Sequence, residues 1–456
     1  MKSIMRSLTF MKSHGIMWTA FLLLPCLLIS MFSGGKIITS SFDQVKMLFM
    51  HNKPTLYSRR STTKTKIQTY YVSANGSDRN SGLSTASPFK TIQKAADLTN
   101  PGDTILIKNG LYPEVVITRS GTASAWITYK AHPGHYPKIQ LPQSSWYGIL
   151  IQNGASYIEI KGFEIIGNNA KITLDYAMSQ TKNTLNPLTS GNGISIEGRA
   201  DYSSGHPHHI RILNNKIHDC GGAGIGALEA DYITVEGNEV FNNAWYSPYG
   251  TSGISLGHNW RFDRHTGYKM FIRKNKTYNN RQHIPWIETG TITDGNGIII
   301  DDTRNNHNNS KLGVYTGRTL VENNITYNNG GSGIHTFSSD HVDIVRNTAY
   351  LNNQSPEIKH GQIFANMSSD VKILRNILYA PSDKYINGNN QNTNVTYDHN
   401  IYANSALIKV KGPNDILADP KFVNPSIADF RLQANSPAIG KGFTWDRNQL
   451  KSNQHK

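Results

Sequence analysis

The chain has 456 residues, so it can bury a large core and has room for two or three ordinary domains or for one long solenoid. Charged residues make up only 17% of it, and two cysteines exclude a scaffold held together by disulfides. The net charge of +15 favours an anionic partner, but the Lys and Arg residues are scattered and match no nucleic-acid-binding motif, so we expect an acidic polysaccharide rather than nucleic acid.

Residues 1–35 have the pattern of an export signal. Basic side chains without an acidic one precede an apolar run over residues 16–32. This is typical of a signal peptide or of an uncleaved signal anchor, and the small residues Ser33 and Gly35 favour cleavage. Residues 36–66 lack periodicity and are interpreted as a linker. We therefore expect a secreted, extracellular or periplasmic protein, which contacts a membrane only if the first segment is retained.

Residues 67–140 are predicted to form an N-terminal cap and the first coils. Residues 69–73 alternate polar and apolar side chains, as a half-buried strand does. Residues 88–96 place their apolar side chains at helical spacing, and residues 101–107 form a turn into a buried strand. A short helix of this kind covers the open end of a solenoid, whose first coil otherwise exposes unpaired strand edges.

Residues 141–405 repeat two short patterns. One is a strand of the form Gly-Ile-x-apolar, which begins at Gly148, Gly193, Gly224, Gly253, Gly297 and Gly333. The other is a strand followed by a marker asparagine, at Asn215, Asn238, Asn275, Asn324, Asn347, Asn376 and Asn400. The shortest steps between these asparagines are 23 and 24 residues, and a third strand follows each of them. Such coils predict an all-β fold, a right-handed parallel β-helix, in which the asparagine amides stack from coil to coil.

The longer steps between marker asparagines locate loops. Extra residues fall near 199–209, 243–252, 259–269, 281–296 and 303–318. These loops flank the same few coils, and long loops on a solenoid usually carry function. We therefore expect them to wall a groove.

Strand alternation predicts which side chains line that groove. With the first Ile of each Gly-Ile strand pointing inward, the second and fourth positions and the residue that follows point outward. On coils about 4.8 Å apart, these positions hold Glu229, His258, Asp301, Asp302 and His335. A compact column of carboxylates and imidazoles between long loops is the arrangement expected of an active site.

The loops add side chains that suit acidic sugars. Trp245, Trp260 and Trp286 offer aromatic platforms, and Arg261 and Arg304 offer cations. The predicted substrate-binding residues are Glu229, Trp245, Trp260, Arg261 and Trp286. The alternative for the tryptophans is that they only pack the loops onto the helix.

The aspartate pair of the column has further oxygen donors close by in the sequence. Asp301 and Asp302, together with Asp294 and Asn305, place several oxygen atoms within a short reach, which is the donor set that Ca²⁺ prefers. The alternative is an ordinary turn after a strand.

Residues 294–302, the strand that begins at residue 333 and the asparagine repeat resemble the pectate-lyase-like β-helix superfamily, most of all family 9 pectate lyases. The cap in residues 69–112 and the closing segment in residues 419–439 look like the same group. The likeness thus covers nearly the whole mature chain, with residues 406–456 as C-terminal cap and tail. These motifs specify the fold far better than the chemistry.

The resemblance implies a reaction. In such lyases a carboxylate cluster binds Ca²⁺, a basic residue removes the proton next to the uronate carboxyl, and the glycosidic bond breaks by β-elimination. The residues that match the carboxylate cluster are Asp294, Asp301, Asp302 and Asn305. The lysine expected as the base has no clear match here. The candidate catalytic side chains are instead His258, His335, Lys359 and Arg304.

Other activities stay open on the same fold. A glycoside hydrolase of polygalacturonase type also pairs aspartates, but there a Gly-His-Gly follows the pair, whereas His258 precedes it. A uronate epimerase uses similar proton chemistry, and a non-catalytic carbohydrate-binding protein would hold glycan in the same column. The concentration of titratable groups favours an enzyme, which we expect to be a monomer.

Overall fold

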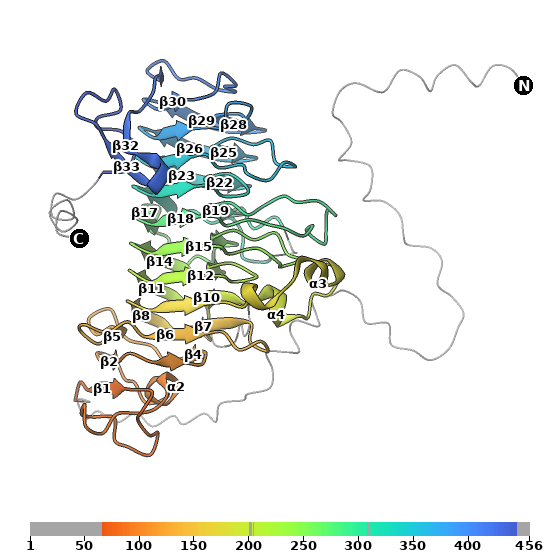
Figure 1. The fold of residues 1–456 in the computed structure, drawn as a ribbon. Coiled ribbons are helices and arrows are strands. Elements are labelled where there is room, and N and C mark those ends of the chain that lie inside the picture. The colour runs from red at the N-terminus through yellow and green to blue at the C-terminus, as the bar shows by residue number, and fades with distance from the viewer. Residues whose placement is uncertain (1–65, 200–202, 204, 308–309, 445–456) are drawn as a thin grey trace, which may run out of the picture. The chain divides into compact units, whose positions relative to one another are not determined.

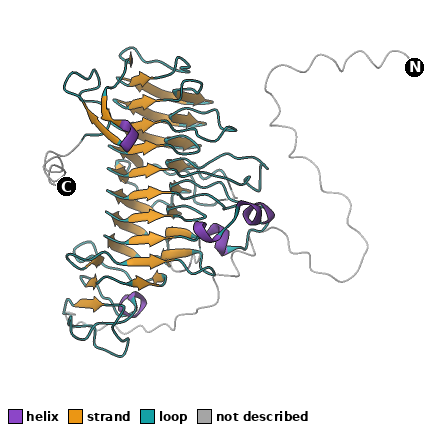
Figure 2. Cartoon of the chain, viewed as in Figure 1, coloured by secondary structure: helices purple, strands orange, loops and turns teal. Residues whose placement is uncertain are grey.

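The computed structural model describes residues 66–199, 203, 205–307 and 310–444. In this part of the chain each strand of three long sheets runs parallel to its counterparts in the coils before and after it, so the coils stack into a parallel β-helix (Figure 1). Strands dominate and helices are few and short (Figure 2). The predicted fold class is confirmed. The predicted export segment and nearly all of the predicted linker lie outside the described residues.

Sheet A contains the strands that lead to the marker asparagines. Its strands are β1 (Thr69–Val72), β2 (Thr104–Ile107), β5 (Ile127–Ala131), β8 (Ser156–Lys161), β11 (His208–Leu213), β14 (Asp231–Glu236), β17 (Tyr268–Arg273), β20 (Arg318–Glu322), β23 (Asp340–Val345), β26 (Ser369–Leu374) and β29 (Thr393–Asp398).

Sheet B contains the short third strand of each coil. Its strands are β3 (Leu111–Tyr112), β6 (Lys138–Gln140), β9 (Glu164–Ile166), β12 (Lys216–His218), β15 (Glu239–Phe241), β18 (Lys276–Tyr278), β21 (Ile325–Tyr327), β24 (Thr348–Tyr350), β27 (Ile377–Tyr379), β30 (Ile401–Ala403) and β31 (Ile416–Leu417).

Sheet C contains the Gly-Ile strands. Its strands are β4 (Val115–Ile117), β7 (Tyr147–Gln152), β10 (Asn192–Glu197), β13 (Ile225–Leu228), β16 (Ile254–Gly257), β19 (Ile298–Asp301), β22 (Ile334–Phe337), β25 (Ile363–Asn366) and β28 (Asn387–Asn390).

The Gly-Ile strands pair in the register that the sequence predicts. Ile194, Ile225, Ile254, Ile298 and Ile334 are successive partners along sheet C, and all five are fully buried. Inward isoleucines and valines from the three sheets fill the core, because β-branched side chains pack well on stacked strands. The alternate positions of the same strands therefore face outward.

The marker asparagines form a continuous ladder, as predicted. The backbone N–H and the side-chain amide of Asn238 both donate to Oδ1 of Asn275, at 3.0 Å each. The same pair of bonds joins every marker from Asn215 to Asn400 to the next one. The ladder ends on the carboxylate of Asp415, which accepts both donors of Asn400. Each amide thus satisfies buried groups at one corner of the coil.

A second asparagine ladder runs along another corner and was not predicted. Its members are Asn243, Asn280, Asn329 and Asn352, and it ends on Gln362. Each of the four asparagines follows a marker asparagine by five residues, so the signal was present in the sequence. In the first of these coils the fifth residue is Cys220, a buried free thiol whose backbone N–H donates to Asn243.

Helix α2 (Ile92–Ala96) closes the N-terminal end, as its spacing predicts. The hydroxyl of Thr91 accepts the N–H of Lys94 and caps the first turn. The apolar residues of the helix are buried, and the side chain of Gln93 bonds to the backbone of Val116 in β4. Among the described residues no helix is both long and apolar enough to cross a membrane.

The C-terminal segment folds back onto sheet B. An antiparallel hairpin of β32 (Phe422–Asn424) and β33 (Asp429–Leu432), with a 3-10 turn at Pro425–Ile427, covers part of that sheet. Phe422 and Phe430 pack on the ring of Tyr350. This hairpin gives the aromatic residues of sheet B an apolar cover.

Candidate active site

Loops extend from both ends of the central sheet C strands. Those at the N-terminal ends span residues 167–191, 242–253 and 279–297. Those at the C-terminal ends contain the described residues 198–199, 203, 205–207, 258–267, 302–307 and 310–317. All five predicted loops are present. The sixth, at 167–191, was not predicted, and it carries the 3-10 turn Asn169–Lys171 and the helices α3 (Leu174–Ser179) and α4 (Pro187–Ser190) (Figure 1).

The N-terminal loops hold one another through a small apolar cluster. Ile172 and Ala177 from the first loop pack with Tyr246 from the second and Ile284 from the third. Apolar burial thus joins three segments that lie far apart in the sequence, and it fixes them beside the outer face of sheet C.

The C-terminal loops are anchored by a buried ion pair. The ammonium group of Lys269, near the start of β17, lies 2.7 Å from Asp231 and 2.8 Å from Asp263. Lys269 and Asp231 are fully buried, and the hydroxyl of Tyr315 donates to Asp231 at 2.6 Å. Because Asp263 and Tyr315 belong to different loops, this network holds both loops at the end of sheet C.

The residue after each central sheet C strand forms the predicted column. The N–H of Glu229 donates to the carbonyl of Gly257, and the N–H of His258 donates to the carbonyl of Asp301, so the parallel ladder continues one residue past the strands. Glu229, His258 and Asp302 therefore lie on successive coils. Their φ angles of 52°, 47° and 43° are left-handed, a conformation that costs about 1 kcal/mol in a residue with a side chain. The same conformation recurs after the later strands of sheet C, at Ser338, Met367 and Gln391, so it belongs to the turn that these coils make at this corner.

Asp302 binds two imidazoles. Its Oδ2 lies 3.2 Å from Nδ1 of His258 and 3.2 Å from Nδ1 of His307. The N–H groups of Asn306 and His307 also donate to this carboxylate. Burial opposes the charge of Asp302, but these hydrogen bonds outweigh it and hold the pKa below its ordinary value. Asp302 is thus a buried anion that orients His258.

Asp301, the last residue of β19, has the opposite character. Shielding from water raises the pKa of its carboxyl to about 7, the charges of Asp294 and Asp302 add to the rise, and His258 opposes it. For His258, burial favours the neutral form, but the hydrogen bond to Asp302 and the charges of both aspartates raise the pKa. The protonation states of Asp301 and His258 are therefore linked, because each charge shifts the pKa of the other group. We name His258, Asp301 and Asp302 the acidic corner.

Asp294 approaches the acidic corner from the loop at 279–297. Burial raises its pKa to about 6, although the hydroxyl of Thr293 and the amide of Asn296 donate to its carboxylate at 2.7 and 3.1 Å. A Cβ atom at Gly250 would lie 2.6 Å from Oδ2 of Asp294, so the absence of a side chain there leaves room for the carboxylate. The corner thus gathers acidic groups from both sets of loops.

Three of the four predicted calcium ligands contact protein partners in this arrangement. Both carboxylate oxygens of Asp302 and of Asp294 already accept hydrogen bonds from protein donors. The amide of Asn305 joins two loops instead, because it donates to the carbonyls of Asn259 and Gly313 at 3.0 and 2.6 Å. No three His, Cys, Asp or Glu side chains in the described part of the chain are placed to hold a metal ion. Oδ1 of Asn305 has no hydrogen-bond partner among the described residues, so it and the carboxylate of Asp301 are the donors that would hold Ca²⁺.

Two of the predicted catalytic residues lie away from the acidic corner. The guanidinium of Arg304 forms a forked ion pair with Asp340 at the start of β23, with contacts of 2.8 to 3.0 Å. Asp340 neutralises the charge of Arg304, and this ion pair links the loop after β19 to sheet A. Lys359 is exposed on the loop before β25. The structure therefore brings neither side chain to Asp301.

His335 lies on the correct face but is covered. It is two residues along the strand and one coil away from Asp301, which places the backbones of the two residues about 8 Å apart. It is only 5% exposed, its ring stacks on Phe364 at 4.8 Å, and His360 lies 5.8 Å away. Neither ring nitrogen has a hydrogen-bond partner, and burial holds the pKa well below its ordinary value. His335 is therefore a neutral imidazole beneath the loop that carries His360.

Two of the predicted substrate-binding residues meet beside the column. The carboxylate of Glu229 lies 3.6 Å from Nδ1 of His206, and the ring of His206 stacks on Trp260 at 4.8 Å. Arg261 is exposed on the same loop, and no carboxylate among the described residues lies within ion-pair distance of it. Trp260 and Arg261 thus flank the acidic corner from one side.

The other two tryptophans belong to the opposite loops. The indole N–H of Trp245 donates to the carbonyl of Asn279, and its ring packs against Tyr246 and His283. Trp286 is half-buried in a turn, and its backbone N–H donates to the carbonyl of Thr291. Trp245 therefore packs loop against loop, which was the alternative considered for it.

Three side chains near the column are not among the predicted site residues. His307 is the second imidazole on Asp302, His206 contacts Glu229, and Arg199 binds Glu197, the last residue of β10, at 2.7 Å. All three are loop residues, and loops carry no periodic pattern that would show which strand they fold onto.

Residues 70–366 match the family described as "Pel9A-like, right handed beta helix region". The chain belongs to this Pel9A-like family. The match spans more than half of the chain, contains the whole acidic corner, and confirms the resemblance and the handedness inferred from the sequence. A Pel9A-like fold is related to carbohydrate-active proteins that are mostly enzymes.

Individual relatives of this Pel9A-like chain are distant. It is 26% identical over 451 residues to the Bacillus subtilis (strain 168) protein "Uncharacterized protein YwoF", which covers 81% of this chain and 91% of the relative. Among solved structures it is similar to pectate lyase Pel9A, with 16% identity, coverage of 84% and 93%, and a TM-score of 0.45. A structure titled "Rhamnogalacturonan lyase" shows 17% identity, coverage of 84% and 98%, and a TM-score of 0.37.

Proposed function

We propose that this protein is a secreted polysaccharide lyase that cleaves a uronate-containing polysaccharide by β-elimination. The observation that carries the proposal is the acidic corner. There, one carboxyl has a pKa raised to about 7 beside an imidazole whose own pKa is raised. A group that transfers protons at neutral pH works best when its pKa lies near that pH.

The proposed reaction moves one proton on and one proton off the substrate. Asp301, as a carboxylate, takes the proton from the sugar carbon that bears the uronate carboxyl. The released electron pair forms a carbon–carbon double bond while the bond to the neighbouring glycosidic oxygen breaks. His258, protonated and held by Asp302 at 3.2 Å, gives its proton to that oxygen. The products are an unsaturated uronate and a new reducing end, and a proton passing from Asp301 back to His258 restores both groups.

Side chains around the acidic corner suit an acidic sugar. Arg261 is an exposed cation with which a uronate carboxylate can pair, and neutralising that carboxylate makes the neighbouring proton easier to remove. Trp260 offers an aromatic ring on the same loop, with one face already stacked on His206. We assign these two residues to substrate binding.

Calcium assistance remains a prediction from the family resemblance. The carboxylates of Asp294 and Asp302 accept hydrogen bonds from protein donors, and the proposed steps use side chains alone. We also propose that the reaction takes place outside the cytoplasm, where the predicted export segment would deliver the chain. We propose acidic polysaccharides as the substrates and a monomer as the active form of the enzyme.

The test is an assay of purified protein against polygalacturonate, alginate and glycosaminoglycans. Formation of the unsaturated uronate is followed by its ultraviolet absorbance, with and without added Ca²⁺ and with and without a chelator. We expect absorbance and new reducing ends to appear together on at least one polymer. New reducing ends without absorbance would indicate a hydrolase, altered sugar stereochemistry without cleavage an epimerase, and binding without any change a carbohydrate-binding protein. Each of these results would overturn the lyase proposal.

The matched variants are Asp301→Asn and Asp383→Asn. Asparagine is native at the position equivalent to Asp301 two coils later, at Asn366, so the first variant should fold. Asp383 is exposed on a loop before β28 and serves as the control. We expect Asp301→Asn to slow the reaction about 100-fold or more and Asp383→Asn to leave it unchanged. Equal rates for the two variants would remove Asp301 from the mechanism.

A further inference from the structure

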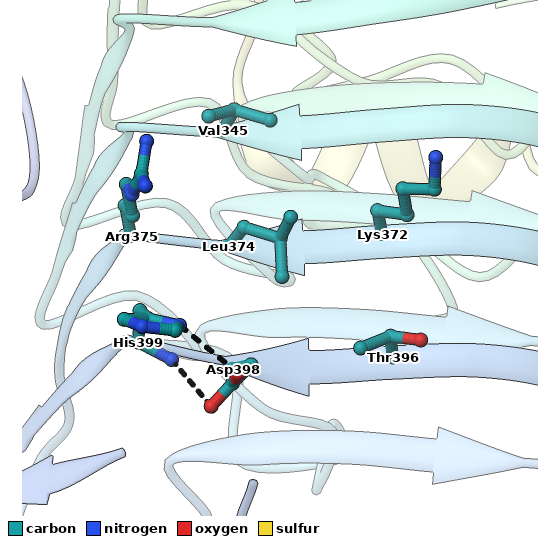
Figure 3. A pocket seen from close by; sticks show the side chains of 7 residues that line it. All are labelled: Val345, Lys372, Leu374, Arg375, Thr396, Asp398 and His399. Carbon is teal, nitrogen blue, oxygen red and sulfur yellow. Dashed lines mark hydrogen bonds and ion pairs between the residues drawn. The ribbon is translucent and has the colours of Figure 1, made fainter. Parts of the chain in front are cut away.

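A shallow hollow with basic edges lies on the outer face of sheet A, near the C-terminal end of the solenoid. It has a volume of about 500 Å³, and we name it the β26 hollow (Figure 3). The residues that line it are Val345, Lys372, Leu374, Arg375, Thr396, Asp398 and His399. None of them belongs to the acidic corner or to the loops around it.

Three neighbouring strands build this hollow. Val345 of β23, Leu374 of β26 and Asp398 of β29 are partners in register, and so are Lys372 and Thr396. Leu374 forms an apolar floor, and Lys372 and Arg375 stand at either side of it (Figure 3). The hollow thus offers an apolar surface between two cations.

The charge of the hollow is unbalanced. No carboxylate among the described residues lies within ion-pair distance of Lys372 or Arg375, and both side chains are exposed. The only acid in the lining, Asp398, accepts from the backbone and amide of Asn414 and pairs with His399 at 2.9 Å. The two cations are therefore available to an external anion.

The basic edge continues along the corner that follows sheet A. The N–H of Arg346 donates to the carbonyl of Leu374, and the N–H of Arg375 donates to that of Asp398, so Arg346 and Arg375 lie one above the other. Both have left-handed φ angles, 56° and 57°. Asparagine suits this backbone better and occupies the equivalent position at Asn323. Arginines on adjacent coils make the surface an extended one, which suits a polymer better than a single small anion.

We infer that the β26 hollow is a second binding site for acidic polysaccharide, separate from the acidic corner. A uronate ring would lie on Leu374, with its carboxylate between the fork of Arg375 and the ammonium of Lys372 and a ring hydroxyl near Thr396. The choice of uronate rests on the proposed function, whereas the need for an anionic polymer comes from the hollow itself. Such a site would hold the protein on its polymer while the acidic corner acts elsewhere on the chain.

The experiment compares two double variants of the full chain. Lys372→Thr with Arg375→Asn removes both cations of the hollow and introduces residues that neighbouring coils already have, as at Thr396 and Asn323. Lys130→Gln with Lys161→Gln removes two cations that are partners on the same face of sheet A at its other end. The two variants thus have equal net charge. Binding to immobilised polygalacturonate and alginate is measured at fixed ionic strength, with the methyl-esterified polymer and polyphosphate as further probes.

We expect the hollow variant to bind at least one uronate polymer about tenfold more weakly than the control variant, and the difference to vanish on the esterified polymer. Equal affinities of the two variants would overturn the inference, and so would a difference that persists on the esterified polymer or appears with polyphosphate alone. Because binding is measured, the result is independent of catalysis. Weakened binding without any lyase activity would refute the proposed function only, and lyase activity with equal affinities would refute the second site only.

Discussion

Replacing Asn275 by alanine should remove a central rung of the first asparagine ladder. The side chain of Asn275 makes four hydrogen bonds. Its Oδ1 accepts the backbone N–H and the amide of Asn238, and its Nδ2 donates to the carbonyl of Val235 and to Oδ1 of Asn324. All of these groups are buried, and Asn275 itself is only 1% exposed.

The expected loss of stability follows from these bonds. A buried hydrogen bond contributes about 1 kcal/mol, so four of them amount to about 4 kcal/mol. The backbone N–H of Asn238 accounts for the largest share, because Asn275 is its hydrogen-bond partner and no water can enter without opening the corner. A loss of this size is a large part of the roughly 5–15 kcal/mol that stabilises a folded domain.

The measurement is a urea titration followed by circular dichroism. The control is Asn214→Gly, because Asn214 is exposed at a left-handed position, and glycine occupies the equivalent position in the next coil at Gly237. We expect the control to shift the free energy of unfolding by no more than about 0.5 kcal/mol. If Asn275→Ala behaved like the control, the ladder would be a consequence of coil stacking and would not stabilise it.

Three further predictions concern the site and its anchor. Lys269→Met should reduce the free energy of unfolding by about 3–5 kcal/mol in a urea titration, because it leaves the buried carboxylate of Asp231 without its cation. A loss below about 1 kcal/mol would contradict this prediction. Asp301 has a pKa raised to about 7, above its unfolded value, so the stability that this group contributes is present at acidic pH and is lost as the pH rises towards 7. The urea midpoint of Asp301→Asn should therefore increase relative to that of the native chain between about pH 4 and pH 7. A constant difference between the two midpoints would count against the raised pKa. Asp294→Asn should move the acidic limb of the pH profile of kcat/KM to lower pH, because the negative charge of Asp294 helps to raise the pKa of Asp301, and an unmoved limb would show that the two groups do not interact.

The fold could be predicted because its repeat appears directly in the sequence. Isoleucines at a fixed strand position and asparagines at 23-residue steps each reflect a contact between neighbouring coils, so a regular spacing implies a regular stack. The second ladder has the same kind of spacing, five residues after the first, but only four of the seven markers have an asparagine there, and the other three positions hold Cys220, Pro381 and Ser405. A pattern with such interruptions is harder to recognise than an unbroken one.

The site could be predicted only as far as strand alternation applies. Asp301, Asp302 and His258 follow directly from the register of sheet C, and the structure brings them together. Beyond residue 302 the chain leaves the strand through a left-handed turn, and alternation no longer predicts direction, so Arg304 reaches Asp340 instead. For His335 the predicted face was correct, but which loop would cover it depends on tertiary packing that no spacing in the sequence reports.

The first asparagine ladder also has a direction. Oδ1 of each marker accepts from the coil before it. The backbone N–H and one amide hydrogen of the marker donate to the coil after it, so these two donors remain unsatisfied until the next coil is in place. Asp415 ends this series because a carboxylate accepts both donors of Asn400 and requires no further coil. The protein can therefore be treated as a modular object. We expect a truncation before Asp415 to leave an open end that binds the next available strand, whereas a 23-residue coil added before Asp415 would keep a terminated ladder.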